Sequence, residues 1–236
     1  MSTETAIVLV EPAGPLNLGA VARVMKNFGL TDLRLVAPHC TPQDPEALLM
    51  AVHAQEVLSG AQLFSTLGEA LADRERVVGT TARTRDLPVA MDPAQALGWL
   101  VGRGALVFGP EDRGLSNQEL ALCQRWLTLP THPAYPSLNL AQAVGICCYE
   151  LDRTPPEPTP TVALAAASEL AGFYDHASEL LLEIGYLQPH TQARRLAKLR
   201  RIFSRAQLTS AEVALLRGVV RQMRWATARC KDASIQ

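Results

Sequence analysis

The chain has 236 residues, of which 48% are hydrophobic and 19% are charged, and its formal net charge at pH 7 is −1. This composition excludes an intrinsically disordered chain and allows a full hydrophobic core. The balanced total hides an asymmetry: residues 1–153 carry five more acidic than basic side chains, whereas residues 154–236 carry four more basic than acidic ones, which is typical of a part that binds a polyanion.

Short apolar runs alternate with helical patterns over the first 150 residues. We expect strands at 7–10, 33–36, 76–79, 106–108 and 126–129, and helices at 19–28, 45–58, 93–101 and 138–151. Capping boxes at Thr66–Glu69 and Ser116–Glu119 open two further helices, and Asp92 with Pro93 begins the helix at 93. This alternation predicts an α/β fold, with a parallel sheet covered by helices on both faces.

The last third of the chain reads as a separate helical part. Four prolines within 154–161 predict a semi-rigid linker. Helical patterns follow at 162–184, 191–203 and 209–227, the last opened by a capping box at Thr209–Glu212. We therefore predict a domain at 1–153, a linker at 154–161 and a small all-α extension at 162–236.

Cysteine usage and the N-terminal residues indicate a cytoplasmic protein. The five cysteines include no C-x-x-C pair and the histidines are scattered, so we expect buried thiols in a reducing compartment and no metal site. We expect no signal peptide, because no basic n-region precedes a long apolar run, and no apolar run approaches the roughly 20 residues that span a bilayer.

Three loops that follow predicted strands are the candidate binding elements: 17–23, 107–116 and 129–140, with 79–83 as a weaker fourth. The first lacks both the G-x-G-x-x-G and the P-loop pattern, and the chain has no G-x-S-x-G elbow. Each loop has a structural alternative, in which Asn17 or Ser137 only caps a helix, Gly109 and Gly114 only serve turns, and Arg23 is a surface cation. Ligands bind at the carboxyl ends of parallel strands, so the four loops together favour a site.

Three segments, 17–23, 106–115 and 129–143, resemble in this order the three motifs of the SPOUT methyltransferases, in the branch of the tRNA and rRNA ribose 2′-O-methyltransferases. The run 184–218 resembles the tail of a tRNA enzyme of this branch that methylates nucleotide 32 in the anticodon loop. The resemblance implies a trefoil-knotted sheet and a homodimer. It also implies S-adenosylmethionine as donor, S-adenosylhomocysteine as product, and no metal.

The resemblance also implies roles for individual residues. It assigns donor binding to Thr80, Thr81, Ala82, Gly109, Gly114, Leu129, Ser137 and Leu138, and catalysis to Arg23, supported by Asn17, Glu111, Ser137 and Asn139. Guanidinium groups stay protonated in proteins, so we interpret Arg23 as a phosphate clamp that stabilises a developing alkoxide. Glu111 is either a proton acceptor or a carboxylate that binds backbone amides of its own glycine-containing loop, and both interpretations stay open.

A basic segment in the extension predicts tRNA as partner. It holds six cations in twelve residues and no acid: Arg194, Arg195, Lys198, Arg200, Arg201 and Arg205. Such a run is often only a solvated helix face, but the missing acids favour phosphate contacts, and Arg217, Arg221 and Arg224 repeat on one face of the next helix. We expect Arg83 and Arg85 to contact the substrate strand near the target, and we expect neither DNA nor a membrane as partner.

Two other interpretations remain open. One is a non-catalytic RNA-binding protein of the same fold, against which the intact Asn17, Arg23, Glu111 and Asn139 argue. The other is a SPOUT enzyme that acts on another tRNA or rRNA site or on a base nitrogen. Titration with S-adenosylmethionine discriminates the first from an enzyme, because a pure RNA binder does not need the donor.

Overall fold

The structure is a computed structural model that describes residues 4–82, 91–132, 134–157 and 164–233. The chain divides into two compact units, Met1–Thr159 and Pro160–Gln236. Within the described ranges, no helix combines the length and the apolar character needed to traverse a bilayer.

A six-stranded parallel sheet forms the centre of the first unit, with the strand order β3-β2-β1-β5-β4-β6. The strands are β1 (Ala6–Val10), β2 (Leu33–Val36), β3 (Gln62–Phe64), β4 (Arg76–Thr80), β5 (Gly104–Phe108) and β6 (Arg125–Leu127). Ile7 on β1 pairs with Leu33 on β2 and with Leu106 on β5. The predicted parallel sheet is therefore confirmed, and β3 is an additional edge strand, which no apolar run announced because Gln62 and Leu63 are exposed.

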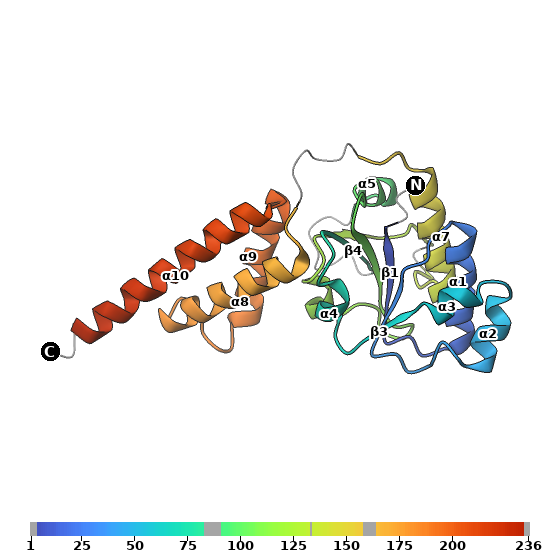
Figure 1. The fold of residues 1–236 in the computed structure, drawn as a ribbon, viewed down its shortest axis with the longest axis horizontal. Helices are drawn as coiled ribbons and strands as arrows, with labels where there is room; N and C mark the ends of the chain where they lie inside the picture. The colour runs from blue at the N-terminus through green and yellow to red at the C-terminus, as the bar shows by residue number, and fades with distance from the viewer. Residues whose placement is uncertain (1–3, 83–90, 133, 158–163, 234–236) are drawn as a thin grey trace. The chain divides into compact units, whose positions relative to one another are not determined.

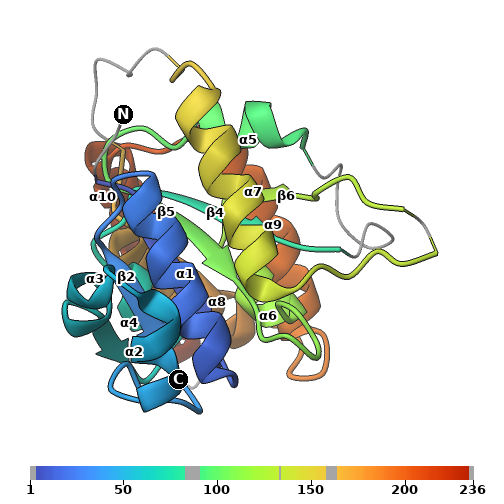
Figure 2. The same cartoon turned by 90° about the vertical axis from the view of Figure 1, so that its right-hand side faces the viewer.

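Helices cover the sheet on both sides (Figure 1), which is why β1, β2 and β5 are buried along their whole length. The helices of this unit are α1 (Pro15–Asn27), α2 (Pro45–Ala51), α3 (Gln55–Ser59), α4 (Leu67–Leu71), α5 (Pro93–Gly98), α6 (Asn117–Leu120) and α7 (Leu140–Arg153). Figure 2 shows α1 and α7 side by side on one face of the sheet, where they contact each other. The caps predicted at Thr66, Asp92 and Ser116 all form.

The structure corrects the bounds of the helices predicted in this unit, most of all at 45–58 and at 19–28. The pattern at 45–58 is two helices, α2 and α3, because Val52 adopts φ +55° and breaks the helical path between them. Helix α1 begins four residues earlier than predicted, with Pro15 in its first turn, a position where the ring costs no hydrogen bond. Asn17 consequently lies inside α1 and does not cap it.

A cluster of two arginines and two aspartates joins β2 to the segment after α4. The Asp73 carboxylate accepts hydrogen bonds from Arg34 (2.6 and 3.0 Å) and from Arg74 (2.7 Å), and Asp32 accepts from Arg34 as well. Arg34 is only 4% exposed, so its charge needs these partners. The hydrogen bonds from Arg34, followed by those from Arg74, hold the pKa of Asp73 well below its usual range despite its partial burial.

We expect Asp73→Asn to lower the free energy of unfolding by about 1 kcal/mol at pH 7, a modest value because the carboxylate is partly screened by solvent. A carboxylate whose pKa is depressed by folding stabilises above its unfolded pKa of about 4, and this contribution is lost as the pH falls further. Urea denaturation should therefore show a smaller difference between the two proteins at pH 3 than at pH 7. Glu46→Gln, in the exposed first turn of α2, is the control. If Asp73→Asn lowered the free energy of unfolding equally at pH 3 and pH 7, the expectation would be contradicted.

The second unit consists of α8 (Ala167–Glu183), α9 (Gln192–Ala206) and α10 (Ser210–Ala233). Phe173 and Tyr174 of α8 and Val213 of α10 form its buried core, and Phe203 of α9 packs edge-on against Phe173 at 5.1 Å between ring centroids. The predicted capping box at Thr209 forms. Of the predicted linker, residues 158–161 lie outside the described part of the chain, and residues 154–157 pack on the first unit, where Glu157 N donates to Gly98 O.

Candidate active site

The carboxyl ends of four neighbouring strands, β1, β5, β4 and β6, carry the loops that form the candidate site. A cavity of about 220 Å³ opens there, between the loops that follow β4, β5 and β6. Its lining consists of Thr80, Thr81, Ala82, Phe108, Gly109, Pro110, Glu111, Asp112, Arg113, Gly114, Leu115, Leu129, Pro136, Ser137, Leu138, Leu140 and Ala143. The parallel sheet thus brings segments separated by more than 50 residues to one edge.

All eight residues to which the resemblance assigns donor binding line this cavity: Thr80, Thr81, Ala82, Gly109, Gly114, Leu129, Ser137 and Leu138. Backbone and side-chain bonds between the loops fix them in place. Thr80 Oγ1 donates to Val107 O on β5 (3.0 Å), and Thr81 N donates to Leu127 O on β6 (3.0 Å). The structure gathers the eight residues in one place, and their role in donor binding stays a prediction.

The loop after β5 is a tight glycine turn, hereafter the glycine loop (residues 109–114). A Cβ atom on Gly109 would lie 2.3 Å from Gly114 C and Leu115 N, so no side chain fits there. Gly114 adopts φ +65°, a conformation that favours glycine. Both glycines are needed for the turn itself, and the same turn leaves its backbone open to the cavity.

Three polar side chains that were predicted separately form one hydrogen-bonded chain. Asn139 caps α7, because its Oδ1 accepts from Ala141 N (2.9 Å), and its Nδ2 therefore faces Asn17 Oδ1 (2.9 Å). The Asn17 amide is oriented in turn, so that its Nδ2 donates to Glu111 Oε1 (2.8 Å). The chain links α7, α1 and the glycine loop, which the sequence placed in three different motifs.

The alternative reading that Ser137 only caps the helix is wrong, because Asn139 caps α7 and Ser137 lines the cavity. The interpretation of Glu111 as a ligand of amides in its own loop is not supported among the described residues, where its second oxygen accepts from Ala13 N (3.4 Å). That amide belongs to the loop after β1 and not to the glycine loop. Glu111 therefore links the glycine loop to the loop after β1, independently of any role in proton transfer.

Arg23 lies on α1 with an exposed side chain and is not among the residues that line the cavity. The remaining first-unit cations of interest, Arg83 and Arg85, lie outside the described residues.

A second cluster at the site was missed by sequence reasoning. The guanidinium of Arg113 donates to Glu11 Oε2 (2.8 Å) and to both carboxylate oxygens of Glu119 (2.9 and 3.1 Å). These hydrogen bonds, first those to Glu119 and then those to Glu11, raise the pKa of Arg113 above its usual range. Glu11 and Arg113 are 102 positions apart, and no local pattern predicts such a pair.

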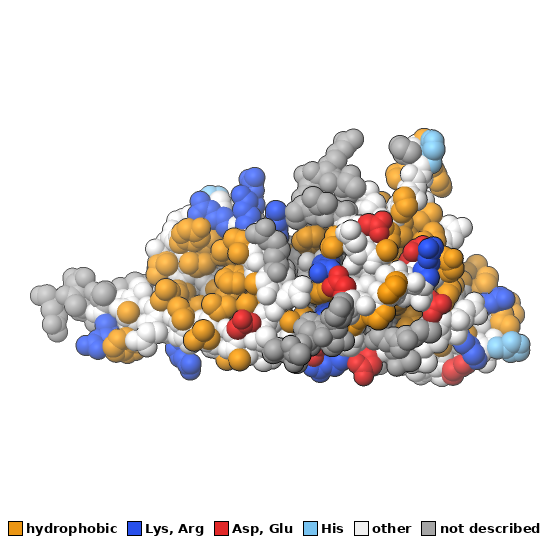
Figure 3. Space-filling model, turned by 90° about the horizontal axis from the view of Figure 1, so that it is seen from above, with side chains coloured by type: hydrophobic (Ala, Val, Ile, Leu, Met, Phe, Trp, Pro, Cys, Tyr) orange, Lys and Arg blue, Asp and Glu red, His pale blue; other side chains and the backbone are white. Residues whose placement is uncertain are grey.

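The basic helix α9 presents three exposed cations on one face: Arg194, Lys198 and Arg201, hereafter the α9 stripe, at spacings of four and three. Among the described side chains, these three form no ion pair. Figure 3 shows a group of cationic side chains, in blue, at the upper border of the helical unit, and further ones at its lower border. The side chain of Arg205, which continues the stripe in sequence, lies outside the described residues.

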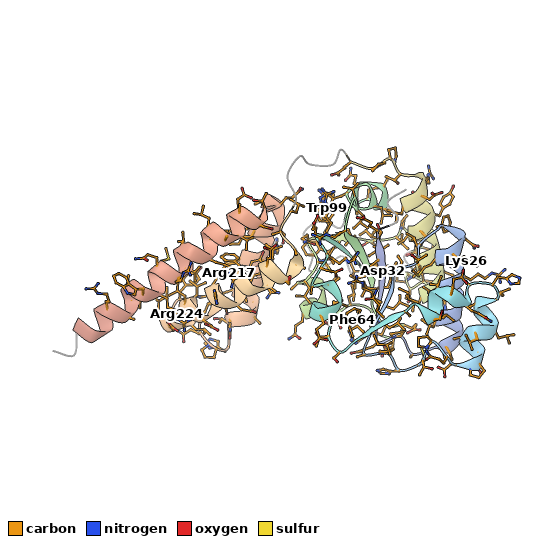
Figure 4. The ribbon with its side chains drawn as sticks, viewed as in Figure 1. Lys26, Asp32, Phe64, Trp99, Arg217 and Arg224 are labelled. Carbon is orange, nitrogen blue, oxygen red and sulfur yellow. The ribbon has the colours of Figure 1, made fainter. Side chains whose placement is uncertain are left out.

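Three other predicted cations of this unit, Arg195, Arg200 and Arg224, contact side chains or backbone within it. The guanidinium of Arg195 lies over the Tyr186 ring (5.5 Å) and donates to Tyr186 O, and that of Arg200 lies over the Tyr174 ring (4.9 Å). Figure 4 labels Arg224 on α10, where it pairs with Glu179 and Glu183 of α8. The idea of Arg217, Arg221 and Arg224 as one free basic face therefore needs correction, because Arg224 is neutralised.

Four cysteines, Cys40, Cys123, Cys147 and Cys148, are buried and free. Burial raises the pKa of the thiols of Cys123, Cys147 and Cys148, so these groups are poor nucleophiles. In the parts of the chain that the structure describes, no group of three His, Cys, Asp or Glu side chains has the arrangement of a metal site.

Comparison with known proteins assigns both units. A family model for the SpoU rRNA Methylase family matches residues 4–149, and a model for the C-terminal domain of the tRNA methyltransferase TrmJ matches residues 168–233. The tRNA (cytidine/uridine-2′-O-)-methyltransferase TrmJ of Klebsiella pneumoniae is 41% identical over 229 residues, which cover 91% of this chain and 93% of that protein.

Solved structures agree with this assignment. The crystal structure of TrmJ from Zymomonas mobilis has 36% identity and a TM-score of 0.84, with 93% of this chain and 99% of that chain covered. A structure concerned with the 2-OH methylation of C/U34 on tRNA has 30% identity and a TM-score of 0.54, and it covers 64% of this chain and 89% of that chain. The chain therefore belongs to the SpoU methylase family, and within it to the TrmJ tRNA (cytidine/uridine-2′-O-)-methyltransferases.

Proposed function

We propose that the protein transfers a methyl group from S-adenosylmethionine to the 2′-hydroxyl of the ribose at nucleotide 32 of tRNA, in the cytoplasm. The observation that carries the proposal is the cavity at the strand ends, which gathers residues from the loops after β4, β5 and β6 around one glycine turn. Position 32 follows from the resemblance of the run 184–218 to the tail of enzymes that act there. The trefoil knot that the same resemblance implies stays a prediction.

The cavity suits this donor chemically. Its lining combines apolar side chains such as Leu115 and Leu138 with glycine backbone and with the carboxylates of Glu111 and Asp112. Apolar walls accept the adenine ring, backbone groups bind the polar edges of the donor, and carboxylates attract its cationic sulfonium. No step of the chemistry requires a metal.

When bound, the donor supplies a methyl group that is already activated on a sulfonium. The protein has to align a ribose hydroxyl with it, which alone lowers the barrier by several kcal/mol. Arg23 binds the phosphate beside the target and stabilises the alkoxide as it forms. Glu111 accepts the hydroxyl proton directly or through water, because its carboxylate, which among the described residues accepts from Asn17 Nδ2 and Ala13 N, keeps further lone pairs.

We also propose a homodimer formed through α1 and α7. These helices pack together and expose Leu16, Ile146 and Tyr149, with 48%, 40% and 53% of each residue accessible. Exposed apolar groups on neighbouring helices are typical of an interface. In such a dimer, Arg23 of one subunit serves the cavity of its partner, which accounts for its place outside the lining of its own cavity.

The α9 stripe is proposed to bind tRNA phosphates. Arg194→Gln, Lys198→Gln and Arg201→Gln combined should weaken tRNA binding about tenfold or more and should reduce the slope of log K against log [salt] by about 2 to 3, since each phosphate contact contributes roughly 0.7 to 0.9. Filter binding across a salt series measures both quantities. Arg224→Gln is the matched control, because the charge of Arg224 is already paired with Glu179 and Glu183. If the triple variant bound tRNA as tightly as the unmodified protein, the role of the α9 stripe would be refuted.

The decisive experiment for the proposed function is mass spectrometry of tRNA from a strain that lacks this gene, with and without the cloned chain. Restoration of 2′-O-methylation at nucleotide 32 is the expected result. Methylation at nucleotide 34 or in rRNA instead would move the target, and no change in any RNA would favour a non-catalytic RNA-binding protein.

A further inference from the structure

We propose that Glu11 is a positioning residue for the methyl donor: through Arg113, it holds the glycine loop against the end of β1. The inference rests on the donor site proposed above. Glu11 lies outside the three loops that resemble family motifs, and it is not among the residues that line the cavity. Its influence on the donor must therefore pass through another residue.

The contacts of Arg113 define that path. Its guanidinium donates to Glu11 Oε2 (2.8 Å), to Gly114 O in the glycine loop (3.0 Å) and to Glu119 in the first turn of α6. The planar guanidinium of Arg113 thus joins the end of β1, the glycine loop and helix α6. Arg113 itself lines the cavity, so a shift of its side chain moves the wall of the site directly.

The backbone of Glu11 has an unusual conformation at the end of β1. Glu11 adopts φ +47°, a region that residues with a Cβ rarely occupy and that favours glycine. Its N–H donates to Val36 O (2.8 Å), which ties this unusual turn to the end of β2. A long carboxylate in this conformation projects from β1 to the glycine loop, where it meets Arg113.

The ion pairs of Arg113 also determine the charge of the cavity wall. A lone guanidinium in the cavity wall would repel a cationic sulfonium, whereas Arg113 is paired with the two carboxylates of Glu11 and Glu119. Although burial opposes it, the hydrogen bonds from Arg113 and Ser116 hold the pKa of Glu119 below its usual range, so Glu119 stays ionised. The triad is then net negative, and loss of Glu11 removes both the tether and one of the compensating charges.

Glu11→Gln in the full-length protein tests the proposal. We expect its Kd for S-adenosylmethionine in calorimetry, and its KM for the donor in methyl transfer, to rise about threefold to tenfold, with kcat at saturating donor and Tm unchanged. Glu11→Gly, which suits φ +47° and keeps the fold, should show the same loss. Glu75→Gln is the matched control. It breaks an ion pair with Arg103 at the amino ends of β4 and β5, whereas the cavity lies at the carboxyl ends, so the donor KM should stay unchanged.

The outcomes separate this inference from the proposed function. If the unmodified protein binds no donor, the proposed function fails first. If the unmodified protein binds the donor and both Glu11 variants bind it equally well, Glu11 has no positioning role. A fall in kcat with an unchanged donor KM would also overturn the proposal, since it would place the effect on the chemical step.

Discussion

Replacing Arg23 by alanine is expected to reduce methyl transfer to tRNA by at least about 100-fold, while the Kd for S-adenosylmethionine changes less than about twofold. The large fall in methyl transfer follows from the loss of a preorganised cation that stabilises the charge developing on the ribose oxygen. The donor affinity should stay nearly unchanged because Arg23 lies on the exposed side of α1, outside the lining of the cavity. Transfer of labelled methyl groups and calorimetry with the donor give the two values.

Lys26→Ala is the matched control for this variant. Lys26 lies on the same helix and is also a cation, but its ammonium is paired with Glu56. It should keep full activity. If Arg23→Ala lost donor binding instead of catalysis, Arg23 would belong to the donor pocket, and our interpretation of its role would be wrong.

The sequence predicted those parts of the fold that local patterns determine. Apolar β-branched runs gave five of the strands, and the caps at Thr66, Asp92 and Ser116 formed because each is a local exchange of hydrogen bonds between residues two or three apart. The failures have local causes as well. The break at Val52 needs a left-handed backbone that no glycine or proline announces, and the edge strand β3 is too exposed to show an apolar run.

The candidate site was predictable only as a set of loops. The carboxyl ends of parallel strands must share one edge, which is why the residues assigned to the donor meet in one cavity. Which side chain bonds which could not be predicted, since Asn17 and Glu111 are 94 positions apart and Glu11 and Arg113 are 102 apart. Likewise, a run of cations in sequence does not reveal that Arg200 packs over Tyr174 while its neighbour Arg201 stays exposed.

Gly109→Ala should produce the largest loss of donor binding, with a Kd raised at least about tenfold. The added Cβ would lie 2.3 Å from two backbone atoms of Gly114 and Leu115, so the glycine loop has to move and the cavity changes shape. Gly68→Ala in α4 is the matched control, because no heavy atom lies within 4 Å of its Cβ and alanine favours a helix. Unchanged donor affinity in Gly109→Ala would mean that the donor does not contact this turn.

Combining the two variants tests whether two subunits share one site. Arg23→Ala keeps an intact cavity, and Gly109→Ala keeps an intact Arg23, so each protein alone should show only a small residual activity at donor concentrations well below the Kd of Gly109→Ala. In a hybrid dimer whose sites are shared, one cavity receives Arg23 from its partner, and random mixing should restore about a quarter of the activity. If Arg23 serves its own subunit, or if the protein is a monomer, no activity returns, because every cavity then lacks either the arginine or the glycine turn.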